Sequence, residues 1–203
     1  MSKEGQTNAQ PAFELDRREA VPKLIGNHKD FLIVCGLAGS SKDIAALTDD
    51  GPHAFTMGGA MGASTMIGLG LALAQPEKQV LVVTGDGELL MNIGALATIA
   101  VINPPNLAII CVDNGHYGET GYQLSHTSLG VDLEGMANGA GLNVTCTVQS
   151  EEELASGARI LRQSNGTAFV VLRVRPDNPP AFKRQMNPAA TRVRFRSALL
   201  GRP

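Results

Sequence analysis

The sequence predicts an α/β fold in three layers, with helices on both faces of a mainly parallel central sheet of about six strands. Short runs rich in Val, Ile and Leu alternate along the chain with longer segments of helical period. Gly, Asn, Asp or Pro stand at most of the junctions, as expected for turns. The apolar runs are continuous, which is typical of strands that are covered on both faces of a parallel sheet.

The expected strands and helices alternate in chain order. The strands lie at 31–35, 53–57, 79–84, 107–113, 143–148 and 168–174. The helices lie near 14–27, 40–48, 61–74, 88–102, 131–140 and 150–164. The last helix begins at "SEEE", where Ser150 can cap it and Glu153 can complete a capping box. Each crossover helix must pack back on the sheet, so the alternation favours parallel strands.

Length and composition fit one globular domain. The 203 residues are 43% hydrophobic and 18% charged, and a chain of this length buries roughly 70% of its unfolded surface. The net charge of -2 is unevenly spread, because residues 183–203 carry six basic residues and no acidic one. We expect a polar N-terminal tail over 1–12, a domain over 13–176, and a basic, Pro-containing extension over 177–203 that is solvated or docks on a subunit.

Several partner classes are disfavoured. Aromatic residues make up only 4% of the chain and are not interleaved with a basic face, so no nucleic-acid partner is expected. The start "MSKEGQTNAQP" lacks the apolar core of a signal peptide, and no apolar run is long enough to cross a bilayer. We therefore expect a cytoplasmic protein with no membrane partner. Cys35, Cys111 and Cys146 lie far apart in apolar segments and are expected to be buried free thiols.

An aspartate between two glycines follows the third expected strand, in "VVTGDGELLMN". Ligands of an open parallel sheet bind beyond the carboxyl ends of its strands. Gly85 and Gly87 let the backbone approach a ligand, and the free N–H groups of the next helix favour an anion. Asp86 is itself negative, so a phosphate site there requires a cation, and an oxygen ligand suits Mg²⁺. Alternatively, Asp86 caps the next helix.

A second oxygen ligand is expected at the end of the neighbouring strand, one right-handed crossover later. The 26 residues after Gly87 hold a helix, an "NPPN" turn and the strand "LAIICVD", and Asn114 follows them. The next loop, "GHYGETGYQ", is rich in glycine and its carbonyl groups can supply a third ligand. Asn114 and Gly115 also suit an ordinary turn. Both motifs together, on adjacent strand ends, favour a site for a metal and a diphosphate.

At these residues the chain resembles the thiamine-diphosphate enzymes, in the domain that binds the diphosphate and Mg²⁺. Residues 85–123 look most like the family of the sulfopyruvate decarboxylase β subunit and the matching half of phosphonopyruvate decarboxylase. The similarity extends from about residue 30 to about residue 174 and is specific over 57–127. It implies the thiamine-diphosphate-binding fold.

The resemblance also implies roles for particular residues. Asp86 and Asn114 would bind Mg²⁺ through their side chains, and His116 through its main-chain carbonyl. Gly87 and Glu88 would offer backbone N–H groups to the diphosphate.

A second group of residues would hold the other parts of the cofactor. In "FTMGGAMGAS", the carbonyl of Gly59 would accept a hydrogen bond from the aminopyrimidine. Met61 would support the bent cofactor, whose two rings must be held together to react; otherwise it is a core methionine. The remaining cofactor-binding residues implied are Ala38, Gly39, Tyr117 and Gly118. The segment "CGLAGSSKD" departs from the family, since it has Leu37 and Ala38 where threonine or glycine is usual.

The implied reaction is decarboxylation of a small anionic 2-oxo acid to an aldehyde and CO2. The candidate catalytic residues are His116, His126 and Thr120, and either histidine can donate a proton, although each also suits a surface role. The loop 115–130 has no Lys or Arg, and only Lys42 lies at a plausible strand end. Either a partner supplies the site for a sulfonate or phosphonate group, or the substrate is less highly charged.

The resemblance also implies a glutamate on a second domain, which activates the cofactor. Only about thirty residues precede the first expected strand. We therefore expect a separate α subunit that carries the pyrimidine-binding domain and this glutamate, in a hetero-oligomer with two or more copies of each chain. The alternatives are a carboligase or synthase subunit with the same cofactor, or a non-catalytic nucleotide- or flavin-binding module. The last is disfavoured because no GxGxxG or P-loop follows the first strand.

Overall fold

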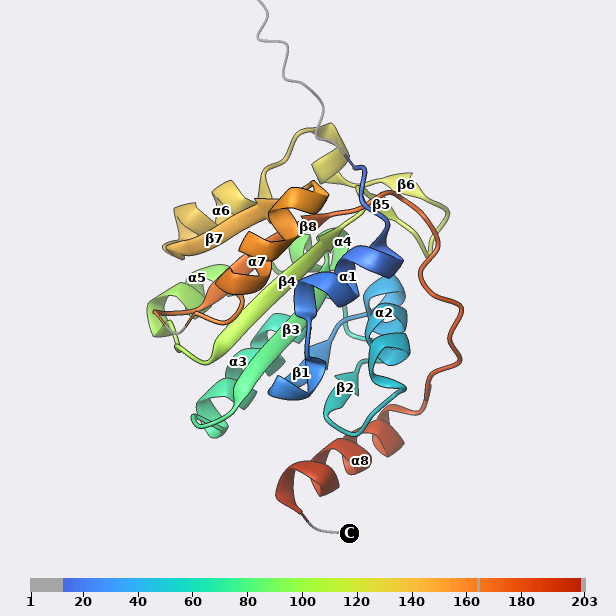
Figure 1. Cartoon of the computed structure of the whole chain (residues 1–203), viewed down its shortest axis with the longest axis vertical. Helices are drawn as coiled ribbons and strands as arrows, with labels where there is room; N and C mark the ends of the chain where they lie inside the picture. Colours follow the sequence, from blue (N-terminus) through green and yellow to red (C-terminus); the bar gives the residue numbers. More distant parts are fainter. Residues whose placement is uncertain (1–12, 164, 202–203) are drawn as a thin grey trace, which may run out of the picture.

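The centre of the molecule is a six-stranded sheet (Figure 1). The computed structural model describes residues 13–163 and 165–201. The strands are β1 (Phe31–Cys35), β2 (Ala54–Thr56), β3 (Gln79–Gly85), β4 (Leu107–Asp113), β7 (Val144–Val148) and β8 (Ala168–Arg173). All neighbouring pairs run parallel. These are the six expected strands, and the predicted α/β class is confirmed.

The strand order places three strand ends side by side. The order is β2-β1-β3-β4-β8-β7, so the chain moves from β1 to one side for β2 and then to the other side for β3. Cys35 pairs with Val83, and Gly85 pairs with Val112. The segments that follow β1, β3 and β4 therefore leave the sheet at the same edge. A reversal of this kind is where open α/β sheets bind ligands.

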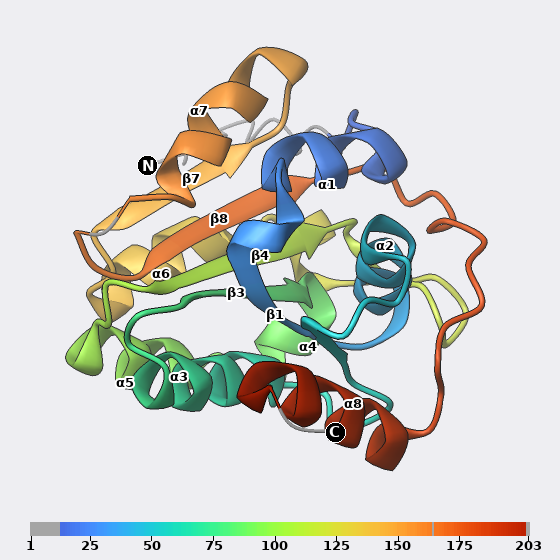
Figure 2. The ribbon, with the colours of Figure 1, turned by 60° about the horizontal axis from the view of Figure 1, so that its bottom comes forward.

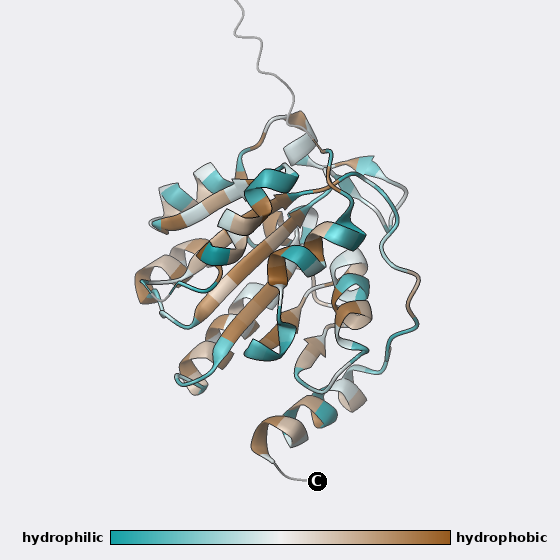
Figure 3. Cartoon of the chain, in the orientation of Figure 1, coloured by the Kyte–Doolittle hydropathy of each residue, from teal (hydrophilic) through white to brown (hydrophobic). Residues whose placement is uncertain are grey.

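Helices cover both faces of the sheet (Figure 2). One face carries α1 (Arg17–Ile25), α2 (Ala38–Thr48) and α7 (Leu154–Ile160), and the other carries α3 (Ser64–Ala74), α4 (Asp86–Leu90), α5 (Ala95–Ile102) and α6 (Leu133–Ala140). Successive side chains of a strand point to opposite faces of the sheet and enter two separate buried clusters. In β3, Leu81 packs with Leu24 of α1, whereas Val82 packs with Leu69 of α3. Figure 3 shows the central strands β3, β4 and β8 mainly in brown, the hydrophobic end of the scale, as two covered faces require.

Two of the expected helices are divided. Residues 88–102 form α4 and α5 with a turn between them, because Asn92 donates from its side chain to the carbonyl of Gly62 and Gly94 has low helix propensity. The segment 150–164 begins as a 3-10 turn at Glu151–Glu153 and continues as α7. The predicted capping box is present, and the Ser150 N–H donates to the Glu153 carboxylate at 3.1 Å.

Other segments lie outside the sheet. After β4 the chain forms a small antiparallel hairpin, β5 (His116–Tyr117) and β6 (Gln123–Leu124), and then a 3-10 turn, His126–Leu129. Helix α8 (Pro188–Leu200), in the predicted C-terminal extension, packs on β2. Residues 1–12 lie outside the described residues, so the division of the chain into tail, domain and extension stays a prediction.

Two further expectations concern the cysteines and the membrane. Cys35 and Cys111 are buried free thiols, as predicted, whereas Cys146 is only half-buried because β7 is an edge strand. None of the helices within residues 13–163 and 165–201 is long and apolar enough to span a bilayer.

Candidate functional site

A cavity of about 250 Å³ lies at the carboxyl edge of β1, β3 and β4. Its walls come from the segments that follow these strands, together with Met61 and the chain at Asn178 and Pro179. The predicted site residues that line it are Ala38, Gly39, Met61, Asp86, Gly87, Glu88, Asn114, His116, Tyr117, Gly118 and Thr120. Gly59 and His126 do not line it, and both are exposed. The topology therefore brings eleven of the thirteen predicted residues to one cavity.

Asp86 follows β3 directly and is 2% exposed. It is the first residue of α4 and makes no side-chain cap, so the alternative that it caps this helix does not hold. Its Oδ2 accepts a hydrogen bond from the hydroxyl of Ser125 and lies 3.3 Å from that of Thr127. Sequence analysis missed both hydroxyl residues, because their contacts span about forty positions of the chain.

Asp113 ends β4 and forms a second buried carboxylate beside Asp86. Its Oδ1 accepts hydrogen bonds from Thr127 Oγ1 at 2.6 Å and from the Gly115 N–H at 3.0 Å. Its Oδ2 has no hydrogen-bond partner, and the nearest cation is Arg173, with Nε 3.8 Å away. Burial raises the pKa of Asp86, and burial together with the Asp86 charge raises the pKa of Asp113.

The donor set at this edge fits a divalent cation. Asp86 is a buried carboxylate that has hydroxyl partners and no cationic side chain among the described residues. Burying such a charge is costly unless an ion compensates it. Asn114 is 8% exposed, and its Oδ1 accepts the His116 N–H at 3.2 Å. That contact is the turn expected as an alternative, and it leaves one lone pair of the amide oxygen for a metal.

Glu88 links two segments around the cavity. One carboxylate oxygen accepts the Leu37 N–H at 3.0 Å, and the other accepts the Ser64 hydroxyl at 2.9 Å. A Cβ atom on Gly36 would overlap this carboxylate, so a larger residue there would displace Glu88 from these contacts. These contacts hold the start of α2 and the start of α3 against α4. The backbone at Ala38 has φ of 56°, a conformation more common at functional turns.

Tyr117 and His116 cover the other side of the cavity. The Tyr117 ring lies against Gly87, where a Cβ atom would overlap it, so the second glycine of "GDG" allows this contact. His116 Nδ1 lies 2.9 Å from the carbonyl oxygen of Asn114. Since a carbonyl only accepts, Nδ1 carries a proton and Nε2 is the nitrogen left to exchange one.

Two cations line the cavity. Arg17, which sequence analysis did not single out, is 4% exposed and donates to both oxygens of Asp43, with the shortest contact at 2.6 Å. Lys42, the one cation expected here, has its Nζ 3.8 Å from Glu119. Asp43 already neutralises Arg17, whereas the half-exposed Lys42 remains available to an anion.

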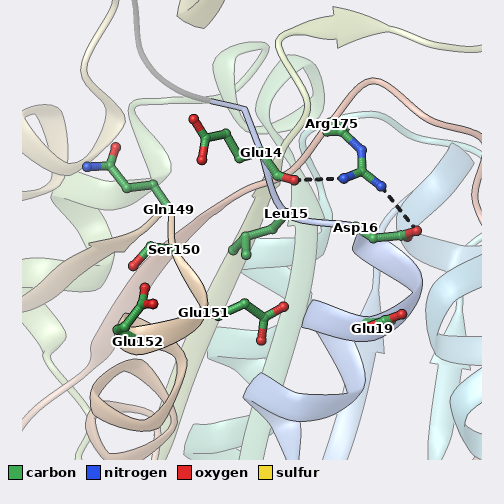
Figure 4. A pocket seen from close by; sticks show the side chains of 9 residues that line it. All are labelled: Glu14, Leu15, Asp16, Glu19, Gln149, Ser150, Glu151, Glu152 and Arg175. Atoms are coloured by element: carbon green, nitrogen blue, oxygen red, sulfur yellow. Dashed lines mark hydrogen bonds and ion pairs between the residues drawn. The ribbon is translucent and has the colours of Figure 1, made fainter.

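A second hollow, of about 440 Å³, lies between α1 and the turn before α7 (Figure 4). Five carboxylates line it: Glu14, Asp16, Glu19, Glu151 and Glu152. The one cation among its described lining residues, Arg175, bonds to the Glu14 carbonyl and to Asp16. Arg18, Lys23 and Arg175 pair with Asp16, Glu19 and Glu151, and the acidic side chains still outnumber these cations, which disfavours a phosphate or an anionic substrate there.

Comparison with known proteins identifies the family of this chain. Residues 39–172 match the family described as thiamine pyrophosphate enzyme, C-terminal TPP binding domain. The chain is 34% identical to sulfopyruvate decarboxylase subunit beta of Methanococcus maripaludis, over 92% of this chain and 99% of the relative. It is 33% identical to phosphonopyruvate decarboxylase of Streptomyces viridochromogenes, over 95% of this chain and 47% of the relative.

Solved structures show the same fold. A thiamin diphosphate-dependent enzyme from Mycobacterium smegmatis superposes with a TM-score of 0.66 at 23% identity, over 87% of this chain and 35% of that one. Benzoylformate decarboxylase from Polynucleobacter necessarius superposes with a TM-score of 0.66 at 20% identity. The match covers 89% of this chain and 36% of that one. This chain spans about a third of those chains. The family match over residues 39–172 and the identity to the curated relatives show that the chain belongs to the thiamine pyrophosphate enzyme family, of which it carries the C-terminal cofactor-binding domain.

Proposed function

We propose that this chain is the β subunit of a thiamine-diphosphate-dependent 2-oxo-acid decarboxylase that acts on a sulfopyruvate- or phosphonopyruvate-like substrate. The observation that carries the proposal is the buried Asp86 beside Asn114, at the edge where Lys42 offers the cavity a cation. Relatives named sulfopyruvate decarboxylase subunit beta match this chain over nearly their whole length, which supports the decarboxylase reading. The products would be an aldehyde and CO2.

The residues of the cavity have separate tasks in this proposal. Asp86, Asn114 and the carbonyl of His116 would hold Mg²⁺, and the N–H groups of Gly87 and Glu88 would face the diphosphate. When bound, thiamine diphosphate supplies the electron sink that makes loss of CO2 feasible. The remaining cofactor contacts are proposed for Ala38, Gly39, Gly59, Met61, Tyr117 and Gly118.

Proton transfer is assigned to His116, because it lines the cavity and His126 does not. Its Nδ1 proton is held by the Asn114 carbonyl, so the imidazolium form would give its proton from Nε2. The Thr120 hydroxyl donates to Gln123 Oε1 at 2.9 Å, which orients its oxygen as an acceptor near the cavity. Lys42 would bind the second anionic group of the substrate, the one that is not lost as CO2.

The proposal includes a partner subunit. Two glutamates line the cavity, but Glu88 is held by Leu37 and Ser64, and Glu119 lies beside Lys42. Glu88 is not free to activate a cofactor and Glu119 is exposed, so we assign this role to a glutamate on an α subunit with the pyrimidine-binding domain. We infer a hetero-oligomer with two or more copies of each chain.

The decisive variant is Asp86→Ala, studied in the full chain purified together with its α subunit. Wild type should bind thiamine diphosphate in calorimetry only with Mg²⁺, and should release CO2 from sulfopyruvate or phosphonopyruvate. Asp86→Ala should lower cofactor affinity by more than about 100-fold, since it removes a metal ligand. Asp30→Asn, an exposed carboxylate at the opposite edge, is the control.

Unchanged affinity in Asp86→Ala would remove the metal site from the proposal. If the wild-type complex released CO2 only when an aldehyde was added, and the products contained a new carbon–carbon bond, the carboligase alternative would replace the decarboxylase. Turnover of no 2-oxo acid, with cofactor bound, would reject both.

A further inference from the structure

Two buried hydroxyl groups contact the carboxylate that is assigned to the metal. Ser125 and Thr127 are both fully buried, and the exposed His126 lies between them. Their oxygens are 2.9 Å apart. Each hydroxyl has one proton to donate, so the pair can serve both carboxylates, with Ser125 donating to Asp86 and Thr127 to Asp113.

Ser125 also lies at the base of the substrate-facing loop. The carbonyl of Gly115 accepts the Ser125 N–H at 2.8 Å and the Ser128 hydroxyl at 2.6 Å, which closes the ends of the segment 116–124. The cavity-lining residues of this segment are His116, Tyr117, Gly118, Glu119, Thr120 and Tyr122. Ser125 therefore both donates to Asp86 through its hydroxyl and closes this loop through its N–H group.

We propose that Ser125 and Thr127 are positioning residues, which fix the orientation of the Asp86 carboxylate toward the metal and couple it to the loop 116–124. Both hydroxyls lie at Oδ2, so Oδ1 is left without a side-chain donor among the described residues. Ser125 donates to Asp86 directly, and Thr127, whose proton goes to Asp113, contacts the Ser125 hydroxyl and holds it beside Asp86. The inference rests on the proposed function, because it assigns Asp86 to Mg²⁺.

A purely structural role would have a different consequence. If the hydroxyls only satisfied buried polar groups, their removal would lower the melting temperature and leave the metal requirement unchanged. Partners of metal ligands usually contribute about 10- to 100-fold to metal affinity. The two roles are therefore separated by measuring the Mg²⁺ requirement and the stability of the same variants.

The variants are Ser125→Ala and Thr127→Val in the full chain, purified with its α subunit. Thiamine diphosphate binding is measured by calorimetry across a range of Mg²⁺ concentrations, and the melting temperature is measured without ligands. We expect both variants to need about 10- to 100-fold more Mg²⁺ for half-maximal binding. Thr127→Ser keeps the hydroxyl and should return the requirement to the wild-type value.

Thr167→Val is the matched control. Thr167 is 1% exposed, and its hydroxyl donates to the Pro104 carbonyl at 3.1 Å, before β8 and at the opposite edge of the sheet. The Thr167→Val variant should have a lower melting temperature than wild type and the same Mg²⁺ requirement. If Ser125→Ala and Thr127→Val match wild type within about twofold, the positioning role is wrong and the proposed function stands. A wild-type complex that binds no cofactor at any Mg²⁺ concentration overturns the proposed function itself, and this inference with it.

Coupling to the loop has its own readout. The chain contains no Trp and two Tyr, Tyr117 and Tyr122, and both line the cavity. Fluorotyrosine incorporated into this chain alone would give two ¹⁹F resonances, both from the loop, even beside an unlabelled α subunit. Both should shift when Mg²⁺ and thiamine diphosphate bind to wild type, and should shift only at higher Mg²⁺ in Ser125→Ala. Shifts at the wild-type concentration in that variant contradict the coupling.

Discussion

His28 and His53 form a stacked pair at the amino edge of the sheet, with ring centroids 5.0 Å apart. His28 Nδ1 lies 2.9 Å from His53 Nε2, so one proton joins the two rings. Burial, and then the positive charges of His28 and Lys29, lower the pKa of His53 below its usual 6.5. The folded state therefore resists protonation of His53 more than the unfolded chain does.

This pair predicts acid sensitivity. Because the unfolded chain binds more protons near pH 6.5, stability should be complete above that pH and fall as the pH drops through it toward the folded pKa. Melting temperatures at about pH 7.5 and about pH 5.5 measure the loss. His53→Gln should show a smaller decrease than wild type, whereas the exposed His126→Gln should show the wild-type decrease. Equal decreases in all three proteins would contradict the prediction.

Some site residues could be predicted from the sequence, because they directly follow strands and the topology of a parallel sheet places them. Asp86 and Asn114 each follow a run of apolar residues, and parallel neighbouring strands end at one edge, so their meeting could be expected. Ser125 and Thr127 follow no such rule. They reach Asp86 through a hairpin whose path depends on tertiary contacts, over separations of 39 and 41 residues. Arg17 was missed for the same reason, since its partner Asp43 lies in another helix.

Helix α3 comes closest to β3 at a glycine. A Cβ atom on Gly68 would overlap the Val82 side chain, whereas one on Gly70, two residues further along the helix, would meet no atom within 4 Å. Gly68 is buried and Gly70 is exposed. The two positions differ in their contact with the sheet, and both lie inside the same helix.

Substituting alanine at the two positions should have opposite effects. Gly68→Ala should destabilise the protein by about 1–3 kcal/mol, because the helix must move away from the sheet. Gly70→Ala should stabilise it by up to about 1 kcal/mol, because alanine favours the helix. Urea unfolding of both variants measures the difference. A stabilising Gly68→Ala would mean that α3 does not pack as closely on β3 as the structure has it.

Helix α8 is an element that the sequence pattern did not predict. The segment 188–200 alternates basic and apolar residues and gives no amphipathic helical period. Its position depends on tertiary contacts: Phe195 lies 5.9 Å from Phe55, ring to ring, and Arg194 donates to Asp50 at 2.9 Å. The strands β1, β3, β4 and β8 were predicted closely because each is a nearly continuous apolar run, a property that a segment carries without its neighbours.

The two faces of the molecule differ in exposed apolar side chains. On the face formed by α3–α6, Leu73 is 53% exposed and Val101 is 87% exposed. Met61 at the cavity is 41% exposed. Among the described residues of α1, α2 and α7, on the other face, no large apolar side chain is exposed. Exposed apolar groups gathered on one side are typical of a protein–protein contact, and relatives of this chain are named as one subunit of an enzyme.

We therefore predict that the face of α3 and α5 binds the α subunit, and that the chain alone does not turn over substrate. Leu73→Asp and Val101→Asp should abolish co-purification with the α subunit, because a charge buried without a partner is costly. As surface substitutions, they should change the stability of the free chain by less than about 0.5 kcal/mol. Ala155→Asp, an exposed position on α7, adds the same charge to the other face and should leave the complex intact. If both α3 and α5 variants co-purified like wild type, a different surface would have to complete the active site.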